Sequence, residues 1–262
     1  LTCWFSVPSL GNNMLRLNQL KKNNFPSLNY SAFCGEALPE KVANSWSLSS
    51  PNSIVENLYG PTETTLAIIG YKWKGKSSIK ECSNGIVPIG KIFKNNYILK
   101  RKDKIFELLL SGNQVFNGYL KDKIKNKEKM KIINNKKYYK TGDFVKINKG
   151  NLIYYGRQDR QIKINGFRIE LQEIENIIKK TFNFNEVAVI GWPKLTSNTY
   201  AGLIAFVKSN KKINSEKTIK KLSNYLSFNQ VPKRIISLKK FKFNINKKID
   251  YNYFLQYLKN EN

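Results

Sequence analysis

A strand–helix–strand pattern near the start of the chain restricts the fold more than any other part of the sequence. Residues 31–35 (Ser-Ala-Phe-Cys-Gly) indicate the end of a strand, and Ile54–Tyr59 indicates a second strand that runs into a Gly-Pro turn. Between them, Glu36–Trp46 has apolar residues at helical spacing on one face. Two strands joined by a helix pair in parallel, so we expect an α/β sheet. Ligands bind at the carboxyl ends of the strands in such sheets, where Cys34 and Tyr59 would lie.

The pattern changes twice further along the chain. Residues 86–155 contain short β-like runs, such as Phe144–Ile147, separated by Gly, Asn and Lys turns, which predicts a small distorted β-barrel or sheet. The remaining residues alternate amphipathic helical stripes with short apolar runs, which is typical of an α+β module. We therefore expect an α/β part at 1–85, a β-barrel-like part at 86–158 and a small α+β domain at 159–262.

Composition narrows the possible functions. The chain has no histidine, which excludes Ser-His-Asp and Cys-His catalysis and His-ligated zinc within it. Its three cysteines are far apart, which disfavours disulfides and thiolate metal sites and fits a cytoplasmic location. We find no apolar run long enough to cross a membrane.

The net charge is +28, but only six of the 46 basic residues are arginine, the residue that nucleic-acid readers prefer. We interpret the charge as compositional and expect no nucleic-acid partner. A nucleic-acid-binding protein stays open on charge alone, as does an acidic protein partner.

Four short motifs follow one another in a fixed order. They are Asn57–Thr65 (NLYGPTETT), Tyr139–Asp143 (YKTGD), Gly156–Gly166 (GRQDRQIKING) and Asn244–Asp250 (NINKKID). Together they resemble the adenylate-forming, AMP-binding enzymes, most closely the D-alanine–D-alanyl carrier protein ligases and the adenylation domains of nonribosomal peptide synthetases. These enzymes activate a carboxylate with ATP and pass it to a thiol.

The resemblance implies that the chain is the C-terminal part of such an enzyme. Residues 1–158 would then be the C-terminal portion of the large AMP-binding domain, and 159–262 would be the small mobile domain. The glycine-rich phosphate loop of the family would lie upstream, so we expect the 262-residue chain alone to be inactive.

The first motif, by this resemblance, contacts the base, the phosphates and the metal. Tyr59 would stack on adenine and Thr62 would bond the α-phosphate, with Gly60 in the same nucleotide-binding turn. Glu63 would hold Mg²⁺, because a hard carboxylate suits a hard cation. A flat π-face suits a base in the same way.

The middle motifs would bind ribose and allow domain motion. Asp143 would accept hydrogen bonds from both ribose hydroxyls, and Arg157 would complete this grip. Asp159 would be the hinge about which the small domain turns between the two half-reactions. The loop containing Lys163, Asn165 and Gly166 would face the active site in the thioester-forming state.

The last motif would supply a catalytic lysine. Lys248 would bridge the substrate carboxylate and the α-phosphate. Lys247 stands where the family has glycine, which leaves the choice between these two lysines open.

The segment Phe33–Pro39 closely resembles the matching segment of the D-alanine–D-alanyl carrier protein ligases. The resemblance implies a substrate pocket lined by Cys34, Leu58, Leu66 and Ala67.

The implied function is ATP-dependent adenylation of a D-alanine-like amino acid and its transfer to the phosphopantetheine thiol of a small acidic carrier protein. ATP is the co-substrate and Mg²⁺ the metal. One alternative is an acyl-CoA synthetase of the same superfamily. Another is a non-catalytic remnant without the phosphate loop.

Overall fold

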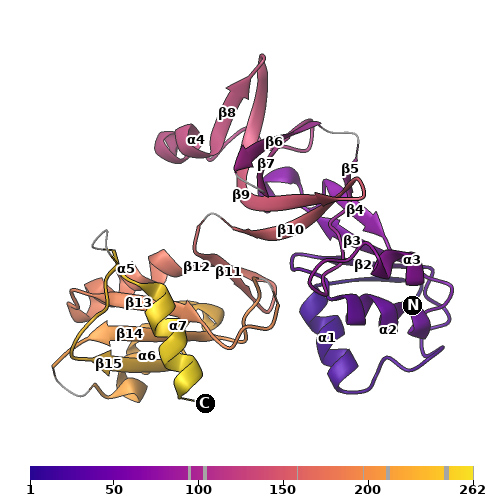
Figure 1. Ribbon diagram of the computed structural model, residues 1–262. Coiled ribbons are helices and arrows are strands. Elements are labelled where there is room, and N and C mark those ends of the chain that lie inside the picture. Colours follow the sequence, from indigo (N-terminus) through magenta and orange to yellow (C-terminus); the bar gives the residue numbers. More distant parts are fainter. Residues whose placement is uncertain are drawn as a thin grey trace. The chain divides into compact units, whose positions relative to one another are not determined.

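Figure 1 shows the computed structural model, which describes residues 1–93, 96–102, 105–157, 159–196, 198–210, 213–244 and 248–261. The chain divides into two compact units, Leu1–Asp159 and Arg160–Asn262. Within the described residues, every helix is too short or too polar to cross a bilayer.

The first unit begins with a five-stranded sheet. Its order is β1-β2-β3-β4-β5, and the strands are Cys3–Ser6, Tyr30–Cys34, Ile54–Tyr59, Ile69–Lys72 and Lys91–Ile92. The first three strands run parallel, and the pairs β3–β4 and β4–β5 are antiparallel. The parallel pairing that the sequence predicts for residues 31–35 and 54–59 is therefore confirmed.

Helices α1 (Pro8–Arg16) and α2 (Glu40–Ser49) pack on the same side of this sheet (Figure 1). Trp46 of α2 is fully buried and meets the edge of Phe33 from β2, with the ring centroids 5.0 Å apart. The chain approaches so closely here that a Cβ at Gly11 would lie 2.8 Å from Val42 Cγ1. Close packing of these side chains buries the apolar face predicted for the helix.

The β-rich part of the first unit is an open antiparallel sheet. Its order is β10-β9-β7-β6, with β8 pairing to β9; the strands are Asn151–Arg157, Lys136–Asn148, Ile105–Ser111, Asn96–Lys102 and Met130–Ile133. Strand β9 is long enough to pair with three neighbours. In the part of the chain that the structure describes, β6 and β10 remain separate edges, so the sheet does not close into the barrel that the sequence allowed.

The two sheets of the first unit meet at a close backbone approach. Gly90 has φ +94°, and a Cβ there would lie 2.0 Å from the Gly70 carbonyl oxygen. The backbone of Ile89 and Gly90 bonds to Leu152 of β10, so this glycine joins the sheets directly. The short helices α3 (Lys76–Ile79) and α4 (Lys123–Lys129) complete the unit.

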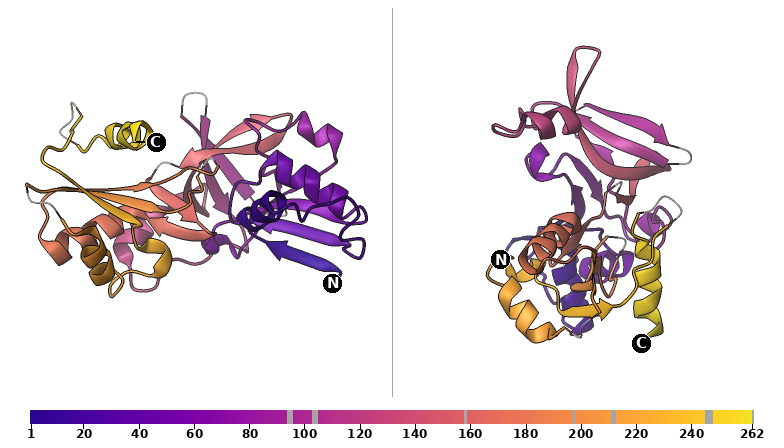
Figure 2. Two further views of the ribbon diagram at one scale, coloured as in Figure 1. Left: turned by 90° about the horizontal axis from the view of Figure 1, so that it is seen from below. Right: turned by 90° about the vertical axis from the view of Figure 1, so that its left-hand side faces the viewer.

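The second unit is a three-stranded sheet with helices on both faces. Strands β13 (Val187–Gly191) and β14 (Leu203–Lys208) are antiparallel, and β15 (Arg234–Leu238) lies parallel to β14. Figure 2, left, shows α7 (Tyr251–Asn260) on one face and the helices α5 (Leu171–Phe182) and α6 (Ser215–Leu222) on the other.

Each face of this second sheet has its own apolar core. Ile174 and Ile178 of α5 pack with Val189 and Ala205 on one face, and Phe254 of α7 packs in a separate cluster on the other. A hairpin of β11 (Gln161–Ile164) and β12 (Phe167–Glu170) precedes α5. The fold class is thus α/β with a smaller α+β unit, as the sequence predicts.

Candidate functional site

The carboxyl end of β3 leads into the turn that contains most of the predicted nucleotide-contacting residues. Tyr59 is the last residue of β3, and Gly60 follows it. A Cβ at Gly60 would lie 2.7 Å from the Leu66 carbonyl oxygen and 2.9 Å from Ala67 Cα. The amide of Ile68 donates to the carbonyl of Tyr59 at 2.9 Å, which closes the loop. A residue without a side chain is therefore required where the chain folds back over the turn.

The returning segment of this loop has a strained backbone. A 3₁₀ turn, Thr62–Thr64, is followed by Thr65 with φ 55° and Leu66 with φ 73°. Positive φ is rare for a β-branched residue such as Thr65. The Thr65 hydroxyl donates to the Gln114 carbonyl at 2.9 Å, and the Gln114 amide donates to the Ala67 carbonyl at 2.8 Å. Gln114 thus holds the strained segment, a feature typical of functional loops.

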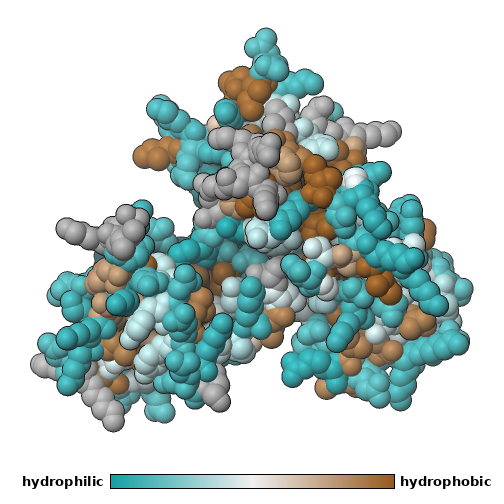
Figure 3. Space-filling model, in the orientation of Figure 1, coloured by the Kyte–Doolittle hydropathy of each residue, from teal (hydrophilic) through white to brown (hydrophobic). Residues whose placement is uncertain are grey.

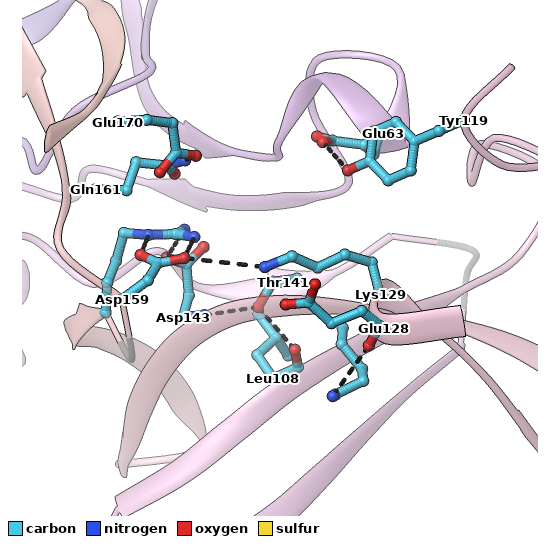
Figure 4. A network of polar contacts seen from close by, with 12 residues as sticks. Glu63, Leu108, Tyr119, Glu128, Lys129, Thr141, Asp143, Asp159, Gln161 and Glu170 are labelled. Atoms are coloured by element: carbon cyan, nitrogen blue, oxygen red, sulfur yellow. Dashed lines mark hydrogen bonds and ion pairs between the residues drawn. The ribbon is translucent and has the colours of Figure 1, made fainter. Parts of the chain in front are cut away.

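Thr62 and Glu63 are neighbours in the 3₁₀ turn but differ in burial. Thr62 is exposed, whereas Glu63 is 8% exposed. The Tyr119 hydroxyl donates to Glu63 Oε1 at 2.6 Å (Figure 4). Burial, and then this hydrogen bond, raise the pKa of Tyr119 above its ordinary value, so the hydroxyl remains a donor.

Glu63 could supply one ligand to a cation. The described residues contain no group of three or more His, Cys, Asp or Glu side chains that could hold a metal. Mg²⁺ does not require such a cage, since it is usually bound through one or two carboxylates together with substrate phosphates and water. The single buried carboxylate next to an exposed threonine hydroxyl fits this donor set.

Asp143 is the centre of a buried polar cluster. The register of β9 and β10 places it directly opposite Arg157, whose Nη1 donates to Asp143 Oδ1 at 2.5 Å. The other carboxylate oxygen, Oδ2, accepts a hydrogen bond from the Tyr59 hydroxyl. Burial raises the pKa of Tyr59 well above its usual range, and the Asp143 charge adds to this. The structure therefore brings together the predicted adenine and ribose residues.

Arg157 connects Asp143 to Asp159. Its Nε and Nη2 donate to the two carboxylate oxygens of Asp159 at 2.7 and 2.9 Å. Burial acts to lower the pKa of Arg157, but the hydrogen bond to Asp159 and the two carboxylate charges raise it above its ordinary value. Lys129 Nζ lies 3.9 Å from Asp159 Oδ2 (Figure 4). Gly142, with φ +72°, permits the approach, since a Cβ there would lie 3.1 Å from Arg157 Nη2.

The predicted pocket residues lie on the neighbouring strand ends. Cys34 ends β2 and is paired with Leu58 of β3. The Cys34 thiol is buried and donates to the Leu66 carbonyl at 3.7 Å. Leu58 and Ala67 are partly buried, whereas the Leu66 side chain is 57% exposed. The structure thus brings Leu66 to this group through its backbone rather than through its side chain.

The remaining predicted residues belong to the second unit. Lys163 lies in β11, and Asn165 and Gly166, with φ 51° and 82°, form the tight turn of the β11–β12 hairpin. Positive φ at both turn positions is what Asn-Gly hairpins favour. The Asn165 amide donates to the side-chain oxygen of Asn229 at 3.3 Å.

Lys248 lies in a turn before α7 and is exposed. Its amide donates to Asn244 Oδ1 at 3.0 Å, and the amide of Asn244 donates to the Lys248 carbonyl at 2.8 Å. Lys247 lies outside the described residues, so the choice between the two lysines stays a prediction.

Among the described residues of the first unit, several contacts to the predicted residues come from side chains that the sequence did not indicate. They are made by Gln114, Tyr119, Lys129 and Thr141. Tyr119 is 56 residues away from Glu63 in the chain, and no local pattern signals such a pairing. Thr141 lies inside a motif, yet its role is structural: its hydroxyl accepts from the Asp143 amide at 3.0 Å and donates to the Leu108 carbonyl at 2.7 Å.

The chain is similar to known ligases over nearly its whole length. The family model described as AMP-binding enzyme matches residues 1–120. The D-alanine–D-alanyl carrier protein ligase of Staphylococcus haemolyticus is 32% identical over 95% of this chain and 51% of the relative. The ligase of the same name from Lactococcus lactis is 34% identical over 95% of this chain and 50% of the relative. The chain thus spans about half the length of the curated relatives it matches.

Solved structures give the same result. The Vibrio cholerae adenylation domain AlmE, in complex with glycyl-adenosine-5'-phosphate, is 31% identical with a TM-score of 0.87, covering 99% of this chain and 50% of that one. A nonribosomal peptide synthetase protein with adenylation and carrier domains is 19% identical with a TM-score of 0.75, covering 97% and 44%, and shows the same fold. Four ordered motifs, this fold and these relatives thus make the chain similar to AMP-binding enzymes, whose family model matches residues 1–120.

Proposed function

We propose that the protein is an AMP-forming acid–thiol ligase that adenylates a small, D-alanine-like amino acid and transfers it to a carrier protein. The observation that carries the proposal is the buried cluster of Tyr59, Asp143 and Arg157 at the carboxyl end of β3. Supporting it, the similar curated proteins are named D-alanine–D-alanyl carrier protein ligases, and the AlmE structure holds a glycyl adenylate.

The cluster suits a nucleoside. The Tyr59 ring offers a flat surface for adenine. Asp143 would accept hydrogen bonds from the ribose hydroxyls, which strengthen because the acceptor is charged. Each carboxylate oxygen can accept two bonds, so ribose can bind while Arg157 keeps its contact. The Arg157 guanidinium pairs with the Asp143 carboxylate at 2.5 Å, which orients the carboxylate as an acceptor for these bonds.

The 3₁₀ turn suits the phosphates. The exposed Thr62 hydroxyl would donate to an α-phosphate oxygen. Glu63, oriented by Tyr119, would hold Mg²⁺, which when bound neutralises phosphate charge.

The proposed reaction has two steps. A carboxylate oxygen of the amino acid attacks the α-phosphorus of ATP, the bond to the pyrophosphate oxygen breaks, and acyl-AMP and pyrophosphate form. Lys248 would stabilise the charge that develops between the carboxylate and the α-phosphate. The phosphopantetheine thiol then loses its proton to solvent and attacks the acyl carbon, which releases AMP. Asp159 would act as the hinge, and the Lys163–Gly166 turn would face the site during the second step.

Cys34 supports a small substrate. Its thiol lies at the strand end, near Leu58 and the Leu66 carbonyl, where a short side chain fits beside a small residue. The net charge of +28 favours an acidic carrier as partner, because complementary charge speeds association.

Pyrophosphate exchange with the full-length protein tests the proposal. The protein is offered ATP with D-alanine, L-alanine, glycine, larger amino acids and fatty acids in turn. We expect exchange with small amino acids and D-alanine first. Exchange only with fatty acids would instead identify an acyl-CoA synthetase, and no exchange with any acid would identify a non-catalytic remnant.

A further inference from the structure

A buried carboxylate in the second unit joins three of its elements. Glu175 of α5 is 4% exposed, and its Oε1 accepts from Arg160 Nη1 and from the Val189 amide of β13, both at 2.8 Å. Its Oε2 accepts from the Tyr251 hydroxyl of α7 at 3.2 Å. A second nitrogen of Arg160 donates to the Val189 carbonyl. The Glu175 carboxylate therefore links α5 to β13, to α7 and to Arg160 at the start of the unit.

Arg160 also stacks on Tyr251. The guanidinium carbon lies 3.3 Å from the centroid of the Tyr251 ring. A planar guanidinium that stacks on one face of a ring while it donates to a carboxylate has little freedom to rotate. Burial raises the pKa of Tyr251 to about 12, with Arg160 opposing and Glu175 adding to the shift, so its hydroxyl remains a donor near neutral pH. Tyr251 is thus fixed on its ring face and at its hydroxyl.

The fixed tyrosine is close in sequence to Lys248. Tyr251 is the first residue of α7, and Asp250 caps that helix by accepting from the amide of Asn252 at 3.1 Å. The Asp250 amide in turn donates to the Lys242 carbonyl at 3.0 Å. Ile249 forms a bridge with Phe243 on the other side of the turn. The two residues between Lys248 and Tyr251 are therefore both held in place, one by the bridge and the other by hydrogen bonds, which restricts how far Lys248 can move relative to Tyr251.

We propose that Arg160, Glu175 and Tyr251 are positioning residues for Lys248. Arg160 directly follows Asp159, so the cluster links the residue after the proposed hinge to the turn that contains the lysine. A rotation at the hinge would then move Lys248 as part of a rigid body. This inference rests on the proposed function, in which Lys248 acts in adenylation. No sequence motif contains Glu175 or Tyr251, and the role follows from the contacts alone.

The test separates the two half-reactions in the full-length protein. Adenylation is measured by pyrophosphate exchange, and thioester formation is measured from preformed acyl-AMP with holo carrier protein. We expect Arg160→Ala to slow adenylation about 10- to 100-fold, since small misplacements of a catalytic group have effects of this order. Thioester formation should change by less than about 2-fold, because Lys248 acts only in the first step. Tyr251→Phe removes one hydrogen bond but keeps the stacked ring, so it should have a smaller effect in the same direction.

Arg234→Ala is the matched control. Arg234 pairs with Glu261 at 3.1 Å, at the other end of α7, where both side chains are more exposed. It should leave both rates unchanged.

The outcomes distinguish the inference from the proposed function. Equal losses in both half-reactions for Arg160→Ala, or no loss in either, would overturn the positioning role. If Arg160→Ala does not fold, Tyr251→Phe decides in its place, and unchanged adenylation in that variant overturns the inference. Lys248→Ala is run in parallel: if it leaves adenylation intact, the proposed role of the lysine fails, whereas a selective loss there without any loss at Arg160 or Tyr251 rejects the positioning alone.

Discussion

At the scale of single residues, Gly60 is a position in the proposed nucleotide site that leaves no room for a side chain. The atoms nearest to a Cβ there are backbone atoms of Leu66 and Ala67, at 2.7–3.0 Å, and backbone atoms cannot move away as the end of a flexible side chain can. We predict that Gly60→Ala displaces the turn between Tyr59 and Thr62 and weakens AMP binding about 10-fold or more. Isothermal calorimetry measures the effect. Gly150→Asn is the control, because no atom lies within 4 Å and both residues of the Lys149-Gly150 hairpin turn have positive φ, which asparagine tolerates. Equal weakening in both variants would contradict the argument.

Cys34 is the residue through which the proposed substrate size can be tested. Its buried thiol points toward the Leu66 carbonyl, 3.7 Å away. Cys34→Leu adds volume at that position, so we predict that activity with alanine falls relative to glycine, by about 10-fold or more. The ratio of pyrophosphate-exchange kcat/KM values for the two amino acids is the measurement. Cys3→Ser, at an exposed cysteine, should leave this ratio unchanged, and an unchanged ratio for Cys34→Leu would place Cys34 outside the pocket.

At the scale of elements, the pairing of β9 with β10 creates the ribose grip. Their register sets Asp143 opposite Arg157, and a bulge between Tyr154 and Gly156 shifts the end of β10 so that this pair forms. Gly142 lies inside β9 with φ +72°, where it leaves room for the guanidinium. Two strands and one irregularity thus position a charged acceptor that is almost fully buried.

The pairing of Asp143 with Arg157 predicts that the site distinguishes ribonucleotides from deoxyribonucleotides. AMP should bind more tightly than 2'-deoxy-AMP, by about 10-fold, because Asp143 loses a hydrogen-bond donor with the deoxy ligand. Asp143→Asn should weaken AMP binding and reduce this ratio toward one. Lys129→Ala is the control, since Lys129 lies 3.9 Å from Asp159 and does not contact Asp143 in any described bond. A ratio that survives Asp143→Asn would show that another group reads the ribose.

Regular periodicity made most elements predictable. The parallel strands β2 and β3 and the helix between them follow from apolar spacing, although the helix begins at Glu40 rather than Glu36 because the chain first turns through Gly35 at φ +95°. The predicted run Phe144–Ile147 is only the end of β9. The part of β9 before Phe144 was not predicted, because it contains Gly142 next to an aspartate, and this pair is typical of a turn and not of a strand interior.

The candidate site was predictable only where local motifs define it. Tyr59, Asp143 and Arg157 lie in such motifs, and the structure brings them into contact. Tyr119 and Gln114 reach the same loop from strand connections far along the chain, so no spacing could indicate them. Long-range pairing depends on the tertiary fold, which short patterns do not contain.

At the scale of the whole molecule, the apolar cores follow the division into two units. Buried clusters around Trp46 and around Leu108 belong to Leu1–Asp159, and those around Ile174 and Phe254 belong to Arg160–Asn262. Each unit therefore has the apolar burial that cooperative folding requires.

Separate cores predict two unfolding transitions. Ile174 and Leu108 are both fully buried, one in each unit. Truncating such a residue to alanine costs about 2–5 kcal/mol, which shifts the melting temperature of a domain of about 100 residues by roughly 10 °C or more. We predict that Ile174→Ala lowers only one of two calorimetric transitions and that Leu108→Ala lowers only the other. Each variant is thereby the control for its counterpart.

Because AMP is proposed to bind at Tyr59 and Asp143, excess AMP should raise only the transition that Leu108→Ala lowers. A single transition that both variants shift together would mean that the units unfold as one, and that hinge motion about Asp159 must work against a shared cooperative core.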